Sequence, residues 1–323
     1  FESKLLIAVG MFCVVLSTLA TNIAANIVSP ANDFSNLAPA KINLFLSVGP
    51  RRGDGLHPIR SVMQAVSLYD DLAVEPADGV SFTVRPEGAA PEDESNLVVK
   101  AVRAFAASVG MGEGAITLTK RIPVAAGLAG GSADAAATLV ALNKAWNGGL
   151  SRKALEKLGA AIGSDVPFCV RGGTALVMGA GEDLSPLGVR EPVWWVLGIG
   201  DGALSTAEVY ARFDALGGGP GIDDPYEAAD GLAKGDVHRI AEGLRNDLEP
   251  AAFALAPGLE AGREALEKAG AVAAIMSGSG PTWCGLCRDE AHARDVAQAA
   301  AGSFARVEVV SSVSHGPAER SRA

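Results

Sequence analysis

Residues 123–133 have the sequence Pro123-Val124-Ala125-Ala126-Gly127-Leu128-Ala129-Gly130-Gly131-Ser132-Ala133, and this glycine-rich stretch decides the fold. A strand-like segment, Ala115–Thr119, precedes it, and an alanine-rich segment, Ala133–Trp146, is predicted to follow as a helix with Ser132 as its cap. Glycines let a backbone approach a ligand closely, and a helix start directs free N–H groups and a positive dipole end at the same point. The stretch therefore predicts an anion site suited to a nucleoside triphosphate.

The glycine-rich stretch differs from the better known nucleotide-binding sequences. The chain has no G-x-x-x-x-G-K-[ST] of P-loop proteins, and the stretch lacks the G-x-G-x-x-G of dinucleotide-binding folds. The H-R-D and D-F-G signatures of protein kinases are also missing. A turn that packs closely before a helix for structural reasons alone is the alternative, and the rest of the chain has to decide between the two.

The composition excludes several classes of protein. Of the 323 residues, 49% are apolar and 20% are charged, which is globular composition with enough chain for a full core. The formal net charge of −10 disfavours nucleic acid as a partner, whereas local backbone dipoles still allow a bound nucleotide. Few cysteines and scattered histidines favour a reducing compartment and predict neither a disulfide framework nor a histidine-rich metal site. These residues are Cys13, Cys169, Cys284, Cys287, His57, His238, His292 and His315.

Residues 1–37 differ in character from the rest of the chain. Leu5–Leu16 is an uncharged apolar run, and residues 21–37 resemble a membrane segment of the nucleobase–cation symporters. One such segment cannot form a transporter. A signal peptide, a membrane anchor, and a fusion or gene-model artefact, which the initial Phe1 favours, are the alternatives. We expect residues 1–37 to lie outside the folded body, with membrane contact only if they are retained.

From Ala38 onward the sequence is typical of an α+β fold. Ile42–Val48 has strand composition, and Gly258–Lys268 is predicted to be helical. The segment Pro186–Pro192, with a proline at each end and one glycine between them, marks a candidate domain boundary.

Three separated segments resemble the GHMP small-molecule kinases. Ala38–Leu44 resembles their first motif, residues 123–133 resemble the second, which wraps ATP, and Ser277–Thr282 resembles the third, a glycine-rich turn near the phosphates. The resemblance implies a two-lobed α+β fold, with a ribosomal S5 domain 2-like N-terminal lobe and a ferredoxin-like C-terminal lobe. The expected parts are an N-terminal lobe over 38–187 that contains the ATP loop, a C-terminal lobe over 188–312, and a disordered tail over 313–323.

Four further segments are similar to one branch of this family, and the whole resemblance covers about residues 38–312. They are Gly53–His57, Ser95–Leu97, Ile162–Phe168 and Asn246–Glu249. That branch phosphorylates the 2-hydroxyl of 4-CDP-2-C-methyl-D-erythritol, a CDP-linked sugar alcohol, in the non-mevalonate synthesis of isoprenoid precursors. The resemblance therefore implies ATP and this sugar alcohol as the small-molecule substrates, with Mg²⁺ accompanying ATP.

The resemblance also implies which residues act. Phosphoryl transfer to an alcohol uses a carboxylate that accepts the hydroxyl proton and a cation that steadies the carboxylate and the phosphate. By the resemblance Asp165 is this base and Lys41 its partner, although taken alone they would be a turn aspartate and a solvated lysine. ATP would contact residues 123–133 and, near the adenine, Asn96, and Ser132 is a candidate oxygen ligand of Mg²⁺. The substrate would contact Asn43, His57 (at the cytosine edge) and Thr206, and the phosphates would lie near Gly278, Ser279 and Gly280.

The chain departs from the family pattern at three places. Leu56 stands where the family usually has a tyrosine, which costs aromatic stacking of about 1 kcal/mol on the cytosine. Ala129 stands where a further glycine is common, and an alanine is tolerated there if its φ angle stays negative. Residues 33–37 replace much of the strand that usually leads into the first motif, so the formation of the first sheet is in question.

Trp283-Cys284-Gly285-Leu286-Cys287 imitates the W-C-G-x-C of thioredoxin-type proteins. A redox pair needs its first cysteine at a helix start, whereas this segment follows a glycine-rich turn and is predicted to be a strand. Alternation along a strand sends Cys284 and Cys287 to opposite faces, so we expect no redox function here. A zinc site is not expected either, because further ligands are distant in the sequence.

Two other functions stay open beside the expected kinase reaction. Another GHMP kinase, acting on homoserine, mevalonate or a sugar, is disfavoured by Gly53–His57, and a panel of substrates would distinguish it. A non-catalytic, membrane-tethered nucleotide-binding protein is suggested by residues 1–37, and fractionation with an assay of ATP turnover would distinguish it. The acidic body, its few cysteines and the nucleotide substrates favour the cytoplasm.

Overall fold

The computed structural model describes residues 34–75, 77, 79–110, 114–219 and 221–319, which form two β-sheets and their covering helices. The eight-stranded sheet contains β1 (Phe34–Val48), β2 (Ile59–Glu75), β3 (Val80–Arg85), β4 (Gly114–Thr119), β5 (Thr174–Gly179), β6 (Asp183–Pro186), β8 (Arg245–Asn246) and β12 (Ala318–Glu319). The four-stranded sheet has the order β11 (Arg306–Ser311), β7 (Trp194–Ile199), β10 (Trp283–Cys287), β9 (Ala273–Met276), and all its pairs are antiparallel. The helices are α2 (Leu97–Val109), α3 (Gly130–Ala145), α4 (Arg152–Ala160), α5 (Val166–Arg171), α6 (Thr206–Ala215), α7 (Tyr226–Lys234), α8 (Val237–Glu242), α9 (Glu249–Leu255), α10 (Ala261–Lys268) and α11 (Glu290–Ala300).

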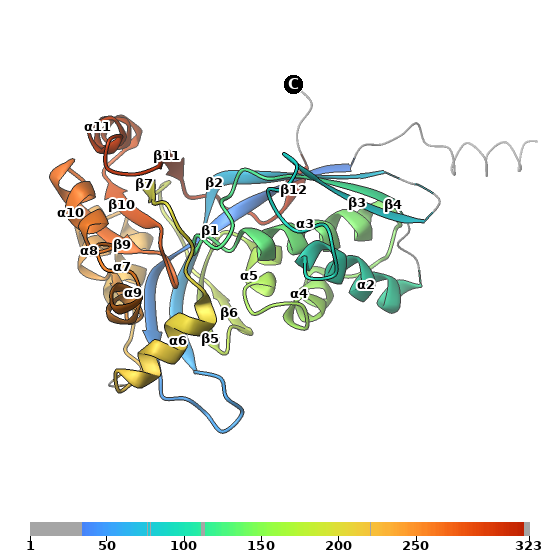
Figure 1. The fold of residues 1–323 in the computed structure, drawn as a ribbon, viewed down its shortest axis with the longest axis horizontal. Helices are drawn as coiled ribbons and strands as arrows, with labels where there is room; N and C mark the ends of the chain where they lie inside the picture. The colour runs from blue at the N-terminus through green and yellow to red at the C-terminus, as the bar shows by residue number, and fades with distance from the viewer. Residues whose placement is uncertain (1–33, 76, 78, 111–113, 220, 320–323) are drawn as a thin grey trace, which may run out of the picture.

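The long antiparallel hairpin of β1 and β2 connects the two halves of the molecule. Figure 1 shows both strands running from the helices α2–α5 to the group formed by α6–α11 and the second sheet. Beyond a register shift at Pro39/Ala40, the apolar residues Ala40, Ile42 and Leu44 enter one hydrophobic cluster with strands of the second sheet. Since side chains alternate along a strand, Lys41 and Asn43 then face the opposite side.

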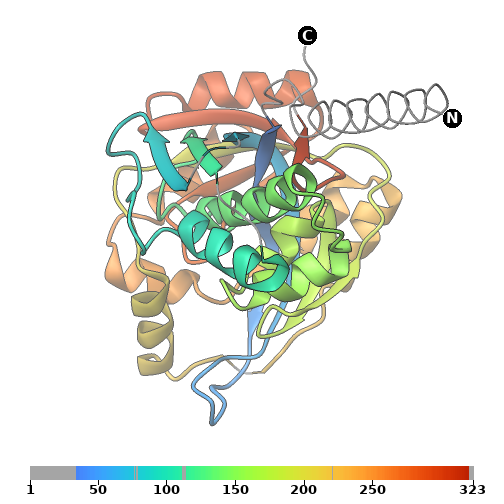
Figure 2. The same ribbon diagram turned by 90° about the vertical axis from the view of Figure 1, so that its right-hand side faces the viewer.

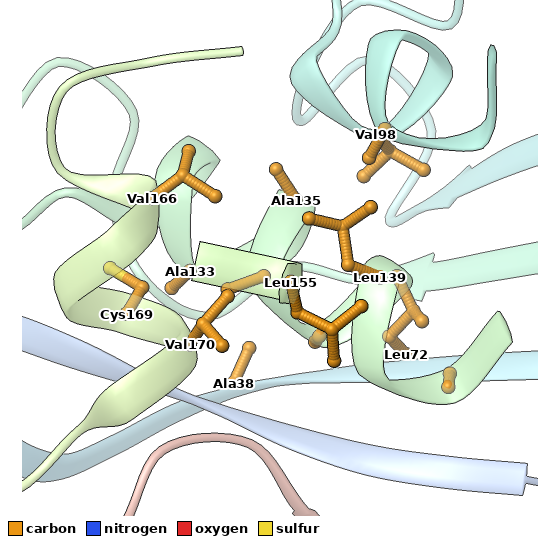
Figure 3. Close-up of a cluster of buried hydrophobic side chains, with 14 of the residues drawn as sticks. Ala38, Leu72, Val98, Ala133, Ala135, Leu139, Leu155, Val166, Cys169 and Val170 are labelled. Atoms are coloured by element: carbon orange, nitrogen blue, oxygen red, sulfur yellow. The ribbon is translucent and has the colours of Figure 1, made fainter. Parts of the chain in front are cut away.

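One hydrophobic core lies between the first sheet and the helices α2–α5. In Figure 2 α2 and α3 lie in front of the sheet, and Figure 3 shows side chains of α2, α3, α4 and α5 turned toward one another and toward Ala38 of β1. The buried side of α3 is rich in alanine from Ala133 to Ala141, and these small side chains allow the helix to approach the sheet closely. Tight packing of this helix fixes the position of the glycine-rich stretch from which it emerges.

The second sheet is buried on both faces, and β10 shows this best. Cys284 and Leu286 belong to the cluster between the two sheets, whereas Trp283 and Cys287 belong to the cluster under α9, α10 and α11. Cys284 and Cys287 are therefore free, buried and on opposite faces of a strand, as the alternation predicts. Burial raises the pKa of both thiols, that of Cys287 to about 12.

The boundary expected at residue 37 is wrong by several residues. β1 begins at Phe34, and Phe34–Leu37 pair with Val74–Asp71 of β2, so these residues complete the first sheet. Strand β2 extends far enough to pair with residues 34–37, and this pairing uses backbone groups, so it does not depend on their side chains. The expectations for residues 1–33 lie outside the described residues, and within the described ranges no helix is both long and apolar enough to cross a bilayer.

The disordered tail expected over 313–323 is also wrong for the part that the structure describes. The Val313 amide donates to Ala65 O, and β12 pairs with β1 through Asn36↔Glu319 and Leu37↔Ala318. The exposed edge of β1 thus gains a partner that the local sequence does not reveal. The division of the chain near residue 187 stays a prediction: the chain passes from β6 to β7 there, but β8 and β12 return to the first sheet.

Candidate active site

A cavity of about 790 Å³ lies where the glycine-rich stretch of residues 123–133, the β1–β2 hairpin and α6 meet. Helices α2, α3 and α6 begin at it, after Asn96, Ala129 and Ser205, and α5 begins there after Asp165. Helix starts carry free N–H groups and a partial positive charge. Their convergence makes this part of the cavity suited to an anionic group.

The glycine-rich loop, residues 123–133, leads into α3 earlier than the sequence predicts. The helix begins at Gly130, so Ser132 lies in its first turn and is not its cap. Ala129 occupies the capping position with φ of 53°, and Ala125 has φ of 54°. The condition that would make an alanine easily tolerated at position 129, a negative φ, is therefore not met, because the chain has to turn through the left-handed region before the helix can start. Such angles cost a non-glycine residue about 1–2 kcal/mol, and the surroundings must hold them.

The second and third glycine-rich segments are in direct contact. Gly127 has φ of +75°, and a Cβ on it would lie 2.3 Å from the Ser277 carbonyl oxygen. Ser277 Oγ donates to Gly127 O at 2.8 Å, and the Thr282 amide reaches Ala126 O at 3.4 Å. Gly278, Ser279 and the glycine-rich loop line the same cavity. Gly280, which the family resemblance places near the phosphates, packs against the Met276 side chain, and its carbonyl oxygen lies close to Gly127.

Lys41 and Asp165, which are 124 positions apart in the sequence, meet on the floor of this cavity. Lys41 Nζ lies 3.1 Å from Asp165 Oδ2, and the lysine side chain is only 5% exposed against 29% for the aspartate. Asp165 stands at the capping position of α5 but makes no cap hydrogen bond, so its carboxylate is turned to the lysine. The Lys41 amide donates to Leu128 O at 3.0 Å, which fixes β1 against the glycine-rich loop.

Asn43 stands beside this ion pair and is held from several sides. Its Oδ1 accepts from Lys41 Nζ at 3.0 Å, and its Nδ2 donates to Ser61 Oγ at 2.8 Å. Its amide reaches Ser277 Oγ at 3.4 Å. A buried residue with these bonds has one orientation, so Lys41 and Asn43 form a fixed wall of the cavity.

His57 and its neighbours form the other end of the cavity. His57 Nδ1 lies 2.9 Å from Gly49 O and Nε2 lies 3.3 Å from Asp214 Oδ1, so both ring nitrogens have protein partners. The Tyr210 ring, on α6, lies 5.2 Å from the imidazole, and Leu56 beside it is 52% exposed. Burial, with the nearby Asp165 charge, raises the pKa of Tyr210, so it stays protonated. Asp214 was missed because the sequence of α6 gives no local sign of which helix face borders a cavity.

Asn96 and Thr206 also line the cavity, whereas Leu128 and Ala133 of the glycine-rich loop are buried in hydrophobic clusters and do not border it. Asn96 caps α2 by accepting from the Val98 amide at 2.9 Å, and its Nδ2 donates to Pro91 O at 2.6 Å. Thr206, at the start of α6, has its Oγ1 3.0 Å from Ser279 Oγ and so connects α6 to the third glycine-rich segment. The helix cap explains Asn96 structurally, and a role near a base stays a prediction.

Sequence reasoning missed Lys120 and Asp134, two charged residues that line the cavity and are themselves buried. Lys120 Nζ lies 2.6 Å from Asp70 Oδ2 and 2.8 Å from Asp134 Oδ2. Burial, assisted by the Asp70 charge, raises the pKa of Asp134 well above its usual range. The one available signal was a lysine and an aspartate that flank the glycine-rich loop on its two sides.

No group of three or more His, Cys, Asp or Glu side chains among the described residues could hold a metal ion. An ion that arrives with a polyphosphate needs only one or two protein oxygens, and the Ser132 hydroxyl is at the right helix turn to be one.

The chain matches two family models, described as the GHMP kinases N terminal domain over residues 96–173 and the GHMP kinases C terminal over residues 228–306. It is 46% identical over 267 residues to the 4-diphosphocytidyl-2-C-methyl-D-erythritol kinase of Salinispora tropica, covering 80% of this chain and 85% of that one. The enzyme of the same name from Nocardia farcinica is 47% identical over 272 residues, covering 82% and 89%. The chain belongs to the 4-diphosphocytidyl-2-C-methyl-D-erythritol kinase family of GHMP kinases.

Solved structures agree with this family. A crystal structure of a 4-(cytidine 5'-diphospho)-2C-methyl-D-erythritol kinase is 34% identical, with a TM-score of 0.72, and it covers 86% of this chain and 98% of that one. A homoserine kinase from Cytophaga hutchinsonii has a TM-score of 0.70 at 22% identity, covering 90% and 98%, which shows the shared fold alone. The predicted two-lobed GHMP kinase fold is confirmed.

Proposed function

We propose that this chain transfers the γ-phosphoryl group of ATP to the 2-hydroxyl of 4-CDP-2-C-methyl-D-erythritol, a step in the non-mevalonate synthesis of isoprenoid precursors. The observation that carries the proposal is the ion pair of Lys41 and Asp165 beside the glycine-rich loop, at 3.1 Å. The names of the relatives at 46% and 47% identity support the substrate.

In this proposal Asp165 is the general base. Its carboxylate accepts the proton of the 2-hydroxyl while the oxygen attacks the γ-phosphorus and ADP leaves. Lys41 orients Asp165 through their ion pair, and its positive charge stabilises the charge that develops on the phosphoryl oxygens. Asn43 holds Lys41 at 3.0 Å, so the lysine reaches the reacting group in one position.

The polyphosphate of ATP is assigned to the free amides of the glycine-rich loop and the start of α3, with Gly278 and Ser279 on the other side. This arrangement is supported by the starts of α2, α3 and α6, which meet at one cavity. The adenine is assigned to the Asn96 side, at the start of α2. Mg²⁺ is proposed as the companion of ATP, with the Ser132 hydroxyl as a protein ligand, and it would neutralise phosphate charge.

The cytidine of the acceptor is assigned to the end formed by Leu56, His57 and Tyr210. Tyr210 offers an aromatic face there and Leu56 an exposed apolar one. His57 Nε2 is already in contact with Asp214, so it can bond the cytosine edge only after this contact is broken. Thr206 is assigned to the acceptor as well, at the start of α6. A cytoplasmic location is proposed because ATP is the phosphoryl donor and the described cysteines are free thiols.

The test is the release of ADP by the full chain with ATP, Mg²⁺ and 4-CDP-2-C-methyl-D-erythritol. We expect turnover that Lys41→Ala and Asp165→Asn each abolish, with Asp289→Asn, at the cap of α11 outside the cavity, as the control. Turnover with homoserine, mevalonate or a sugar in place of the CDP-linked alcohol would assign a different GHMP reaction. ATP binding by folded protein with no turnover on any of these would contradict an enzymatic function.

A further inference from the structure

Three charged side chains form a buried cluster behind the glycine-rich loop. Asp70 on β2 is fully buried, Asp134 on α3 is 2% exposed, and Lys120 lies between them with its ammonium 2.6 Å and 2.8 Å from their carboxylates. The three residues come from a strand, the end of β4 and a helix, so the cluster joins three elements of the N-terminal half.

The cluster joins both ends of the glycine-rich loop. Lys120 stands three positions before Pro123, and Asp134 follows Ala133 directly. Between Lys120 and Pro123 the backbone amides of Arg121 and Ile122 both donate hydrogen bonds to Asp70 Oδ1, that of Ile122 at 2.9 Å. Every residue between the end of β4 and the loop is therefore tied to one carboxylate.

The same ammonium lies under the first residue of α3. A Cβ added to Gly130 would be 3.2 Å from Lys120 Nζ and 2.9 Å from the Ile122 side chain. Gly130 thus packs directly against the buried cluster, and this contact positions the free N–H groups at the start of α3.

The loop held in this way is strained. Ala125 and Ala129 both have left-handed φ angles, 54° and 53°, which an alanine adopts only when the surroundings enforce them. A buried ion cluster adds little net stability compared with apolar side chains of similar volume, so stability alone does not account for three buried charges at this place. Holding a specific backbone geometry does account for them.

We propose that Asp70 is a positioning residue of the ATP site: through Lys120 and the amides of Arg121 and Ile122 it holds the strained loop in its anion-binding conformation. Asp70 itself is fully buried and does not border the cavity, so it acts on ATP through the loop. The inference rests on the proposed function for the identity of the nucleotide. Its readout is ATP binding, which is measured independently of turnover on the CDP-linked alcohol.

The test combines Asp70→Asn with Ala129→Gly. An asparagine keeps an oxygen for the two amides but loses the ion pair with Lys120, and a glycine at 129 adopts the left-handed angle without strain. We expect Asp70→Asn to raise the Kd and the KM for ATP about tenfold while kcat changes by less than about threefold. In the Ala129→Gly background the same substitution should raise the Kd by about threefold or less, because the loop then needs less support.

Asp247→Asn is the matched control. Asp247 is a mostly buried carboxylate that also accepts from a backbone amide, Val48, and from a cation, Arg245, but it lies outside the cavity. It should lower the Tm without raising the Kd for ATP. Hydrogen exchange should rise in the peptide of residues 120–133 of Asp70→Asn and stay unchanged there in Asp247→Asn.

Two results would overturn the proposal. One is an unchanged Kd for ATP in folded Asp70→Asn protein, and the other is the same fold-change in both Ala129 and Ala129→Gly backgrounds. If Asp70→Asn does not fold, Asp134→Asn takes its place. It removes the other carboxylate that pairs with the Lys120 ammonium. ATP binding by this variant is measured without Mg²⁺. If the unsubstituted chain binds ATP but does not phosphorylate the CDP-linked alcohol, the result counts against the proposed function and leaves this inference standing.

Discussion

The two ends of the cavity are built in different ways. The loop end, formed by residues 120–134 with Lys41 and Asp165, rests on paired charges, most of them buried, and on close backbone contacts such as that of Gly127 with Ser277. The hairpin end, formed by residues 49–58 and α6, rests on exposed side chains such as Leu56 and on a longer contact of 3.3 Å between His57 and Asp214. This difference suggests that the loop end fixes the chemistry, whereas the hairpin end allows variation in how the acceptor is held.

The largest effect is expected at the floor of the loop end. Asp165→Asn removes the proposed base, and positioned bases contribute about a hundred- to ten-thousandfold, so kcat should fall by about a thousandfold. Because Asp165 makes no cap bond and is partly exposed, the Tm should change little. Steady-state kinetics with calorimetry would check both. A fall of less than about tenfold in kcat would remove Asp165 as the base.

Gly127→Ala should have the next largest effect. An added Cβ would lie 2.3 Å from Ser277 O and 2.9 Å from Gly280 O, at a φ of +75°, so backbone has to move. A cost of about 3 kcal/mol or more is expected, with weaker ATP binding, because the glycine-rich loop and the third segment separate. Chemical denaturation and ATP titration would measure these changes.

Gly188→Ala is the control for this substitution, since a Cβ there has nothing within 4 Å. It should leave stability within about 0.5 kcal/mol of the original chain. Equal effects of the two substitutions would mean that the close contact at Gly127 is not what holds the loop end together.

The contrast between the ends also explains what the sequence could predict. The strand at Ile42–Val48, the helix near Gly258–Lys268 and the glycine-rich segments have local signals, and each forms close to where it was expected. The pairing of β12 with β1 joins residues more than 280 positions apart, and nothing local announces it. The same holds for Asp70, which lies 50 positions from Lys120.

Some errors came from local rules that the surroundings override. Ser132 has the chemistry of a helix cap, but the helix starts at Gly130 because the loop enters it through a left-handed Ala129. Propensity favours a serine cap by about 1 kcal/mol, which is less than the tertiary contacts around Lys120 and Gly127 can impose. Lys41, Asn43 and Asp165 were accessible from motifs, whereas Lys120, Asp134 and the backbone conformation of the glycine-rich loop were not.

Ala129→Gly measures how much strain the loop end stores. Because a glycine adopts φ of 53° without penalty, the substitution should stabilise the chain by about 1 kcal/mol, less the added freedom of the unfolded chain. For a protein of this size such a gain raises the Tm by about 2–4 °C. Calorimetry would detect it. A lower Tm would show that the alanine methyl contributes packing that outweighs the strain.

Leu56→Tyr tests the hairpin end and should give the smallest effect. Leu56 is 52% exposed, precedes His57 in the chain and lines the same cavity as Tyr210, so a larger aromatic side chain fits there without displacing the core. An added aromatic contact with a cytosine is worth about 0.5–1.5 kcal/mol, which lowers the KM for the CDP-linked alcohol by about two- to tenfold and leaves the KM for ATP unchanged. Leu255→Tyr, at an exposed leucine outside the cavity, is the matched control and should change neither. A KM for ATP that falls together with that for the acceptor would mean that the two ends are coupled, and the distinction between a fixed end and a variable end would then fail.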